Sequence, residues 1–263
     1  SNYRGALQAD GVTFTALDIS AGWRGIGIMN FSDVMSTYLD NCIIEYADNG
    51  VSCNNNDPTI KNNTFRYNIN GIHLANSSDP VIERNYFLSN TYGVYSNSDI
   101  EILIGGSPDA GNVFSGNTLA GLVNQSGLYF VDATYNYWNS INGPMHWEDN
   151  PWGDGDAVLG DVNYDPYISL DAPTVSVEPG IFGNLLSWSH PDEDNIEEYI
   201  INRCCGLSSI TVSSEISSYL DQVDGRWISS SYNVGAVDEN QNQSLFSNLV
   251  TIDNYLLDHT LFV

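Results

Sequence analysis

The sequence predicts an all-β chain in which a solenoid of stacked parallel strands is followed by an antiparallel β-sandwich. Short runs of alternating apolar and polar residues are interrupted by Asn, Gly and Asp-Pro, and this period of two is typical of strands. Similar segments start at Asp57 and Asp79, 22 residues apart, and a repeat of this length is typical of a solenoid. After Leu170 the asparagine-rich turns stop and a different alternation begins, which predicts the sandwich.

The repeat is most regular in DPTIKNNTFRYNINGIHLANSS and in DPVIERNYFLSNTYGVYSNSD, where Phe65 aligns with Phe87 and Gly71 with Gly93. A unit of this size holds only short strands and turns, so it cannot bury its apolar side chains by itself. Successive units must therefore stack strand on strand, with equivalent residues about 4.8 Å apart.

Stacking predicts columns of equivalent side chains along the solenoid. We expect one interior apolar column to consist of Ile43, Phe65 and Phe87. We expect a second column to consist of Asn41, Asn63 and Asn85. A side-chain amide both donates and accepts hydrogen bonds, so an asparagine column at a turn forms a ladder that satisfies a buried bend.

The turns NNTF and RNYF, the strand starts GI and GV, and the segment IGGSPDAGNVFSGN carry a family resemblance. The first part of the chain, residues 1–170, resembles the right-handed parallel β-helix family, which includes pectate-lyase-like proteins and bacterial carbohydrate-binding and sugar-hydrolase repeats. The run from Ala133 to Ile168 is similar to the closing segment of exported bacterial β-helix proteins. The resemblance implies the fold, whereas the activity stays open because this fold hosts lyases, hydrolases, adhesins and spacers.

The second part, residues 171–252, resembles a fibronectin type III domain. Trp188 stands at the position of that family's core tryptophan, Tyr199 begins the next strand, and Tyr232 belongs to an alternating run in the penultimate strand. The resemblance implies an antiparallel β-sandwich that serves as a spacer. His190, before a proline, is expected at the surface, and residues 253–263 are expected to be a tail or the start of a further segment.

The charge balance excludes two classes of partner. Asp and Glu number 33 against 7 Lys and Arg, which gives a net charge of −26. Such a chain does not bind nucleic acid through basic contacts and is not attracted to anionic lipid. Hydrophobic residues make up 42% of the chain, which indicates a folded protein. No apolar run is long enough for membrane insertion, and the start of the sequence lacks a signal-peptide pattern, as expected for a mature chain or a fragment.

A glycine-rich acidic segment lies between Met145 and Pro166. Asp154, Asp156 and Asp161 are the candidate metal ligands, because carboxylates and glycine-exposed carbonyls are the oxygen ligands that calcium prefers. We therefore expect calcium as a cofactor. The alternative is a structural cap over the open edge of the last coil, and the two interpretations are compatible.

Four side chains are candidates for carbohydrate binding. Trp147 and Trp152 lie in the acidic segment, and aromatic rings stack on sugar faces when they are exposed. His73 and Tyr95 belong to an outward column with Ser52. The alternatives are burial of the indoles as a plug, as expected for Trp138, and plain solvation of the column.

Enzymatic interpretations need converging charged groups. A polysaccharide lyase needs a basic residue, but Lys61 is expected opposite Glu83, and Arg84 over Asn62. A glycoside hydrolase needs two carboxylates. The outward acids do not stack as a pair, and we expect Glu45 to align with Tyr67 and Ser89, which favours a binding surface.

The cysteines match no zinc spacing. Cys42 and Cys53 are expected to be buried free thiols, with a disulfide as the alternative, and the adjacent Cys204 and Cys205 to point to opposite faces of a strand.

The resulting expectation is a non-catalytic, extracellular or cell-surface bacterial module that binds a polysaccharide or cell-surface glycan, or is structural or adhesive, stabilised by calcium. A β-helix lyase or hydrolase is one alternative, and an architectural subunit of a filament or surface layer is another. The chain is expected to belong to a longer multidomain protein or assembly.

Overall fold

The structure is a computed structural model that describes residues 6–29, 37–180, 183–191, 193–203, 209–222, 229–240, 242–247 and 249–253. The chain forms two compact units, Ser1–Ser169 and Leu170–Val263. The segment predicted as a tail lies outside the described residues from 254 onward.

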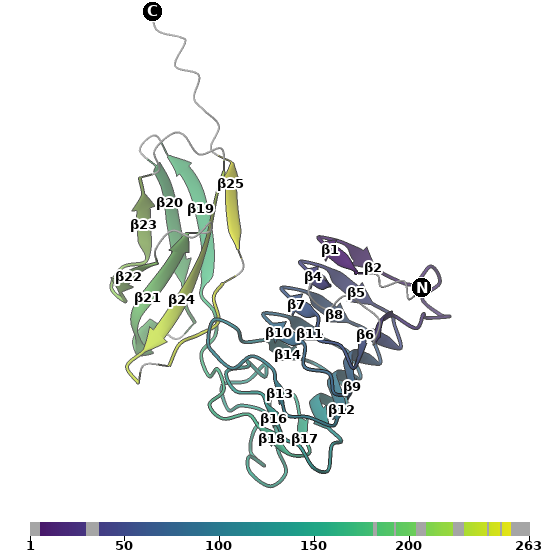
Figure 1. Ribbon diagram of the computed structural model, residues 1–263. Helices are drawn as coiled ribbons and strands as arrows, with labels where there is room; N and C mark the ends of the chain where they lie inside the picture. The colour runs from purple at the N-terminus through teal and green to yellow at the C-terminus, as the bar shows by residue number, and fades with distance from the viewer. Residues whose placement is uncertain are drawn as a thin grey trace, which may run out of the picture. The chain divides into compact units, whose positions relative to one another are not determined.

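The first unit is a parallel β-solenoid, as predicted (Figure 1). Its first sheet consists of β1 (Gln8–Asp10), β4 (Tyr38–Asp40), β7 (Thr59–Lys61) and β10 (Val81–Glu83). Its second sheet consists of β2 (Thr13–Phe14), β5 (Ile43–Glu45), β8 (Thr64–Arg66), β11 (Tyr86–Leu88) and β14 (Val113–Ser115). Its third sheet consists of β3 (Ile26–Met29), β6 (Asn49–Asn54), β9 (Asn70–Asn76), β12 (Tyr92–Ser98), β15 (Ala120–Asn124) and β17 (Val158–Leu159). A short closing sheet consists of β13 (Ile102–Leu103), β16 (Val131–Asp132) and β18 (Val162–Asn163).

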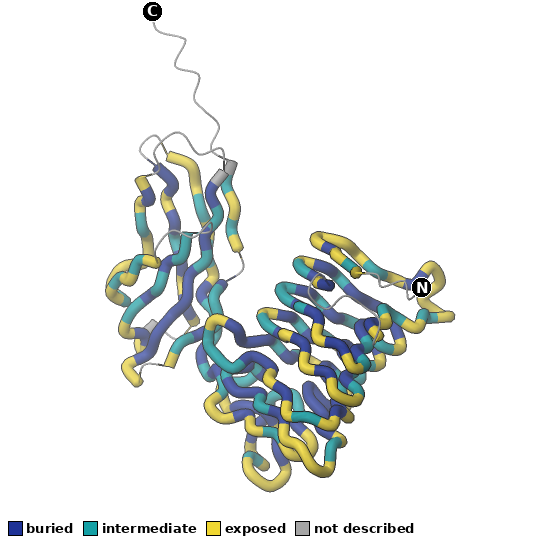
Figure 2. Tube along the Cα trace, viewed as in Figure 1, coloured by how far each residue is buried: buried dark blue, intermediate teal, exposed yellow. Residues whose placement is uncertain are grey.

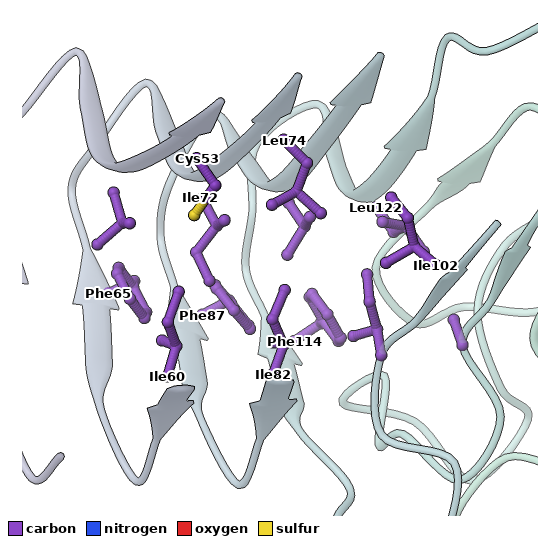
Figure 3. Packing of buried hydrophobic residues seen from close by; sticks show 14 of the residues in the cluster. Cys53, Ile60, Phe65, Ile72, Leu74, Ile82, Phe87, Ile102, Phe114 and Leu122 are labelled. Carbon is purple, nitrogen blue, oxygen red and sulfur yellow. The ribbon is translucent and has the colours of Figure 1, made fainter. Parts of the chain in front are cut away.

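Aromatic rings stack along the interior behind the second sheet (Figure 3). The ring of Phe87 lies 5.2 Å from that of Phe65 and 4.8 Å from that of Phe114, and the indole of Trp138 lies 4.5 Å beyond Phe114. Figure 2 shows that buried and exposed positions alternate along the coils. Trp138 is fully buried, as predicted.

The predicted first member of this column is wrong by one position. Ile44, not Ile43, pairs with Phe65, while Ile43 pairs with Thr64. The coil before Phe65 has a spacing of 21 residues rather than 22, so an alignment with a constant period places the wrong face inward.

The predicted asparagine ladder exists and is longer than predicted. The Oδ1 atom of Asn85 accepts hydrogen bonds from the backbone and side-chain nitrogens of Asn63, each at 3.0 Å, and the same pattern continues through Asn112 to Asn136. Asn41 is not a member. The shorter coil places Cys42 at this level, and its backbone nitrogen donates to Asn63 at 2.9 Å.

A second ladder, which we did not predict, lies at the turn between the second and third sheets. Asn68 donates to Asn90, and Asn90 donates to Asn117, through both backbone and side-chain nitrogens. The carboxylate of Asp156 ends this ladder, because its Oδ2 accepts from the backbone nitrogen of Asn117 at 3.0 Å and its Oδ1 accepts from that of Gly116 at 2.8 Å.

Cys42 and Cys53 are buried free thiols, as predicted. Burial raises the pKa of the Cys53 thiol. The predicted arrangement of Cys204 and Cys205 lies outside the described residues.

The second unit contains two antiparallel sheets, which fit the predicted sandwich. One sheet consists of β19 (Thr174–Gly180), β20 (Gly183–Ser189) and β23 (Ser218–Asp221). The other consists of β22 (Ile210–Ser213), β21 (Ile196–Arg203), β24 (Ser229–Asp238) and β25 (Val250–Asp253). A short 3-10 helix, η1 (Glu193–Asn195), precedes β21.

The core of the second unit contains the aromatic residues that the sequence singled out. Trp188 and Tyr199 are buried with their rings 5.6 Å apart, and Tyr232 is buried beside them in the same core cluster. The expectation that His190 lies at the surface is wrong. It is 4% exposed, and its Nε2 lies 2.8 Å from the carbonyl oxygen of Asp171.

We predict that Asn85→Ala lowers the free energy of unfolding by about 3 kcal/mol, because it leaves buried groups of Asn63 and Ile60 without partners. Chemical denaturation measures the change. The control Asn163→Ala removes an exposed asparagine from β18 and should change the stability by less than about 0.5 kcal/mol. Equal effects of the two substitutions would contradict a special role of the ladder.

Candidate functional site

The outer face of the third sheet brings the predicted column together. Ser52 on β6 pairs with His73 on β9, which pairs with Tyr95 on β12. The rings of His73 and Tyr95 lie 5.7 Å apart, and Tyr92 packs edge-on against Tyr95 at 5.5 Å. Strands β9 and β12 thus carry a compact group of three rings, and Ser52 lies next to it on β6.

His73 in this group is suited to hydrogen bonding. Burial lowers its pKa from the ordinary value of 6.5, and a hydrogen bond with Asn97 offsets part of the change. The imidazole is therefore predominantly neutral at pH 7, and as such it presents one donor and one acceptor nitrogen.

The two predicted tryptophans lie on one loop that connects the second and third sheets near the end of the solenoid. Trp147 is 71% exposed and Trp152 is 89% exposed, so neither indole plugs the core. The backbone nitrogens and carbonyl oxygens of His146 and Asn150 form reciprocal hydrogen bonds of 3.1 and 3.0 Å. Trp147 therefore lies within a hydrogen-bonded turn, and Trp152 follows two residues after it.

Several further hydrogen bonds join the two arms of this loop to each other. The Asn150 side chain donates to the carbonyl oxygens of Asn142 and Pro144, each at 2.9 Å. Gly155 donates to the carbonyl oxygen of Gly143 at 3.1 Å. A Cβ atom at Gly155 would lie 2.3 Å from the carbonyl oxygen of Trp138, so only glycine allows the chain to pass this close to the core.

The predicted metal ligands have separate partners. Asp154 is exposed and bonds to Ser140 and Asn142, which lowers its pKa. Asp156 ends the second ladder, as described above. The backbone carbonyl of Asp161 accepts from the side chain of Asn124 at 2.7 Å. Within the described ranges, no three His, Cys, Asp or Glu side chains gather as a metal site would require.

Three basic side chains on the coils, those of Lys61, Arg66 and Arg84, bond to side chains on adjacent coils. Lys61 pairs with Glu83 at 2.9 Å, as expected from the register. The Arg66 Nε donates to Glu45 at 2.7 Å, and the Arg84 Nε donates to Asn62 at 3.0 Å.

The expected alignment of Glu45 with Tyr67 is wrong, again because the coil is one residue shorter. Glu45 pairs with Arg66, and the rings of Tyr46 and Tyr67 stack at 5.4 Å. We did not identify Tyr46 as a candidate. The signal available in the sequence was the YAD and YNI triplets that follow the strands of the second sheet.

The fold and the stacked coils define a right-handed β-helix protein. A family model described as a right-handed beta helix region matches residues 6–145, more than half of the chain, and the chain therefore belongs to this family. Comparison with curated proteins finds no match. In the part of the chain that the structure describes, no helix has the length and hydrophobicity to cross a membrane.

We predict that Asp156→Ala destabilises the protein by about 2 kcal/mol, because two backbone donors and the Asn117 amide lose their acceptor. Asp156→Asn keeps one acceptor oxygen and should cost less. Thermal and chemical denaturation measure both. A similar cost for the two variants would contradict the capping role.

The same residue should make stability depend on pH. Burial raises the pKa of Asp156, so the folded state binds this proton more readily than the unfolded state. The part of its contribution to the unfolding free energy that depends on this proton is then fully present below pH 3.8, and it is lost as the pH rises through the raised pKa. Comparing Asp156→Asn with the wild type between pH 3 and pH 7 should show this dependence only in the wild type.

Proposed function

We propose that the chain is a non-catalytic, glycan-binding module of an extracellular or cell-surface protein. The observation that carries the proposal is the pair of exposed indoles, Trp147 and Trp152, on a loop held by backbone and side-chain hydrogen bonds. A soluble protein rarely exposes two tryptophans so close in sequence without a partner for them.

Carbohydrate suits this arrangement for a physical reason. The face of an indole offers a flat apolar area that matches the C–H face of a pyranose ring, and its N–H remains free for a hydrogen bond. Anchoring of the loop by Asn150 reduces the conformational entropy lost on binding. The rings of His73, Tyr92 and Tyr95 add a second aromatic surface on the coils.

The arrangement of charges supports binding over catalysis. Lyase chemistry uses a basic group that reaches the substrate, whereas Lys61, Arg66 and Arg84 are each held by a neighbouring coil. The net charge of −26 repels acidic polysaccharides, so the proposal favours neutral glycans. The fibronectin-like second unit serves in this proposal as a spacer.

The proposal does not require calcium, because Asp154 and Asp156 already have hydrogen-bonding partners within the protein. We predict that excess EDTA leaves the melting temperature unchanged and that added calcium raises it no more than added magnesium does. Differential scanning calorimetry checks this. A calcium-specific rise in the melting temperature would contradict this prediction and support the expected calcium site.

We predict that replacing both Trp147 and Trp152 by Ala weakens retention by neutral polysaccharides at least about tenfold, because each lost stacking contact contributes about 1 kcal/mol. Affinity gel electrophoresis through β-glucan, xylan and galactomannan measures retention, with polygalacturonate as the acidic comparison. Leu128→Ala removes another highly exposed apolar side chain and is the matched control. Absence of wild-type retention by all of the neutral polysaccharides would refute the proposal.

A further inference from the structure

His146 is a buried histidine at the base of the loop that carries Trp147 and Trp152, and its ring takes no part in the proposed binding surface. Its side chain is 8% exposed, whereas that of Asp149, three residues later, is 71% exposed. Both residues belong to the turn that is closed by the reciprocal backbone bonds of His146 and Asn150. We call residues 146–150 the Trp147 turn.

One ring nitrogen of His146 lies within reach of both a donor and an acceptor of the same residue. The backbone nitrogen of Asp149 donates to Nδ1 at 3.2 Å. The Oδ2 atom of the Asp149 carboxylate lies 3.3 Å from the same Nδ1. A neutral imidazole has one N–H, so Nδ1 accepts the backbone bond when the proton is on Nε2. In that form Nδ1 has no hydrogen to donate to the carboxylate.

Protonation of His146 exchanges these two partners. Both nitrogens of a charged imidazole are donors, so Nδ1 can no longer accept from the backbone nitrogen of Asp149. It donates to Oδ2 instead, and a bond between two charged groups is shorter and stronger than a neutral one. The carboxylate has room to close the remaining distance because it is largely exposed. The two bonds therefore exclude each other, and the charge of His146 decides which one forms.

The other groups around His146 favour this exchange. On the segment after β18, the ring of Tyr164 packs against the imidazole at 5.8 Å. Burial raises the pKa of Tyr164, and Asp149, Asp165 and Tyr167 raise it further through their charges, so this phenol stays neutral near pH 7. Among the residues that the structure describes, no Lys or Arg forms an ion pair with Asp149 or Asp165. A positive charge on His146 thus meets carboxylates and no competing cation.

The exchange affects only three residues because both sides of the turn are anchored. On one side, the carbonyl oxygen of Met145 accepts from the backbone nitrogen of Val158 on β17 at 3.0 Å. On the other side, the carbonyl oxygen of Asn150 accepts from Gly153 at 3.1 Å, and the Asn150 side chain bonds to the opposite arm of the loop. Loss of the central bond therefore releases residues 147–149 and leaves their flanks in place.

We propose that His146 is a pH-sensitive switch for the presentation of Trp147. Above the pH range in which histidines protonate, the bond from the backbone of Asp149 to Nδ1 holds Trp147 in the ordered turn. As the pH falls through that range, the imidazolium binds the Asp149 carboxylate, the Asp149 backbone nitrogen loses its acceptor, and residues 147–149 become mobile. The switch rests on the proposed glycan-binding function only for its consequence, which is weaker retention at acidic pH.

The test follows the full chain by NMR between about pH 5 and pH 8 with no ligand present. Trp147→Phe and Trp152→Phe assign the two indole signals. The Trp147 signal should move along a one-proton curve, and the protection of the Asp149 amide against exchange should fall about fivefold at the acidic end, as expected for one lost hydrogen bond. The Trp152 signal should move much less. Long-range nitrogen spectra of the imidazole should place the proton of its neutral form on Nε2.

Two variants test the mechanism, and a third is the matched control. In His146→Asn the side-chain oxygen takes the position of Nδ1 and does not titrate, so the Trp147 signal should be independent of pH. Asp149→Asn removes the charge that binds the imidazolium, and the transition should move to a lower pH. Glu148→Gln removes an exposed charge one residue away and should leave the transition nearly unchanged.

Any of three results would overturn the switch: a neutral-form proton on Nδ1, a wild-type Trp147 signal that does not change with pH, or a transition that persists in His146→Asn. If His146→Asn does not fold, equal transitions in Asp149→Asn and Glu148→Gln overturn it instead.

Retention by neutral polysaccharides separates the switch from the binding function. Retention should fall from pH 8 to pH 5 in the wild type and stay constant in His146→Asn. Equal retention by the wild type at both pH values would show that the switch does not control binding, and the proposal would be wrong. Absence of retention at pH 8 would refute the glycan-binding function alone, because the NMR measurements involve no ligand and decide the switch by themselves.

Discussion

The solenoid depends on satisfying backbone groups at the bends between its sheets. Each coil turns sharply at two places where the backbone is buried, and a buried donor without an acceptor is costly. Asparagine side chains solve this at both bends by linking each coil to the next, as Asn63 does with Asn85 and Asn68 with Asn90. These bonds fix the register, and the register places the phenylalanine stack inside.

Because the register is fixed, equivalent positions on successive coils follow the same backbone path. Any functional difference along the surface must therefore come from a change of side chain between equivalent positions. The outward positions of the third sheet change from Ser52 to His73 to Tyr95 without any change in backbone path. At the turn of the second ladder, the equivalent positions change from Tyr46 and Tyr67 to Ser89 and Gly116 on successive coils.

The end of the solenoid uses the same chemistry for a different purpose. Asp156 replaces the next asparagine, accepts the last ladder bonds and thereby attaches the loop that precedes it. Because that loop carries Trp147 and Trp152, one carboxylate links the stability of the last coil to the presentation of the exposed indoles. An acidic residue that suggested a metal ligand thus serves the hydrogen-bond network.

The sequence by itself determined the solenoid, the sandwich, the asparagine ladder and the burial of Trp138, because period, turn residues and stacking are local or strictly repeated properties. The predicted positions of Ile43 and Asn41 were wrong, because one coil is a residue shorter than the others. No residue pattern in the sequence indicates where that residue is missing. Only the tertiary structure decided the partners of Asp156 and the stacking of Tyr46 on Tyr67. Those contacts join residues from different coils, and their geometry depends on the exact spacing between coils.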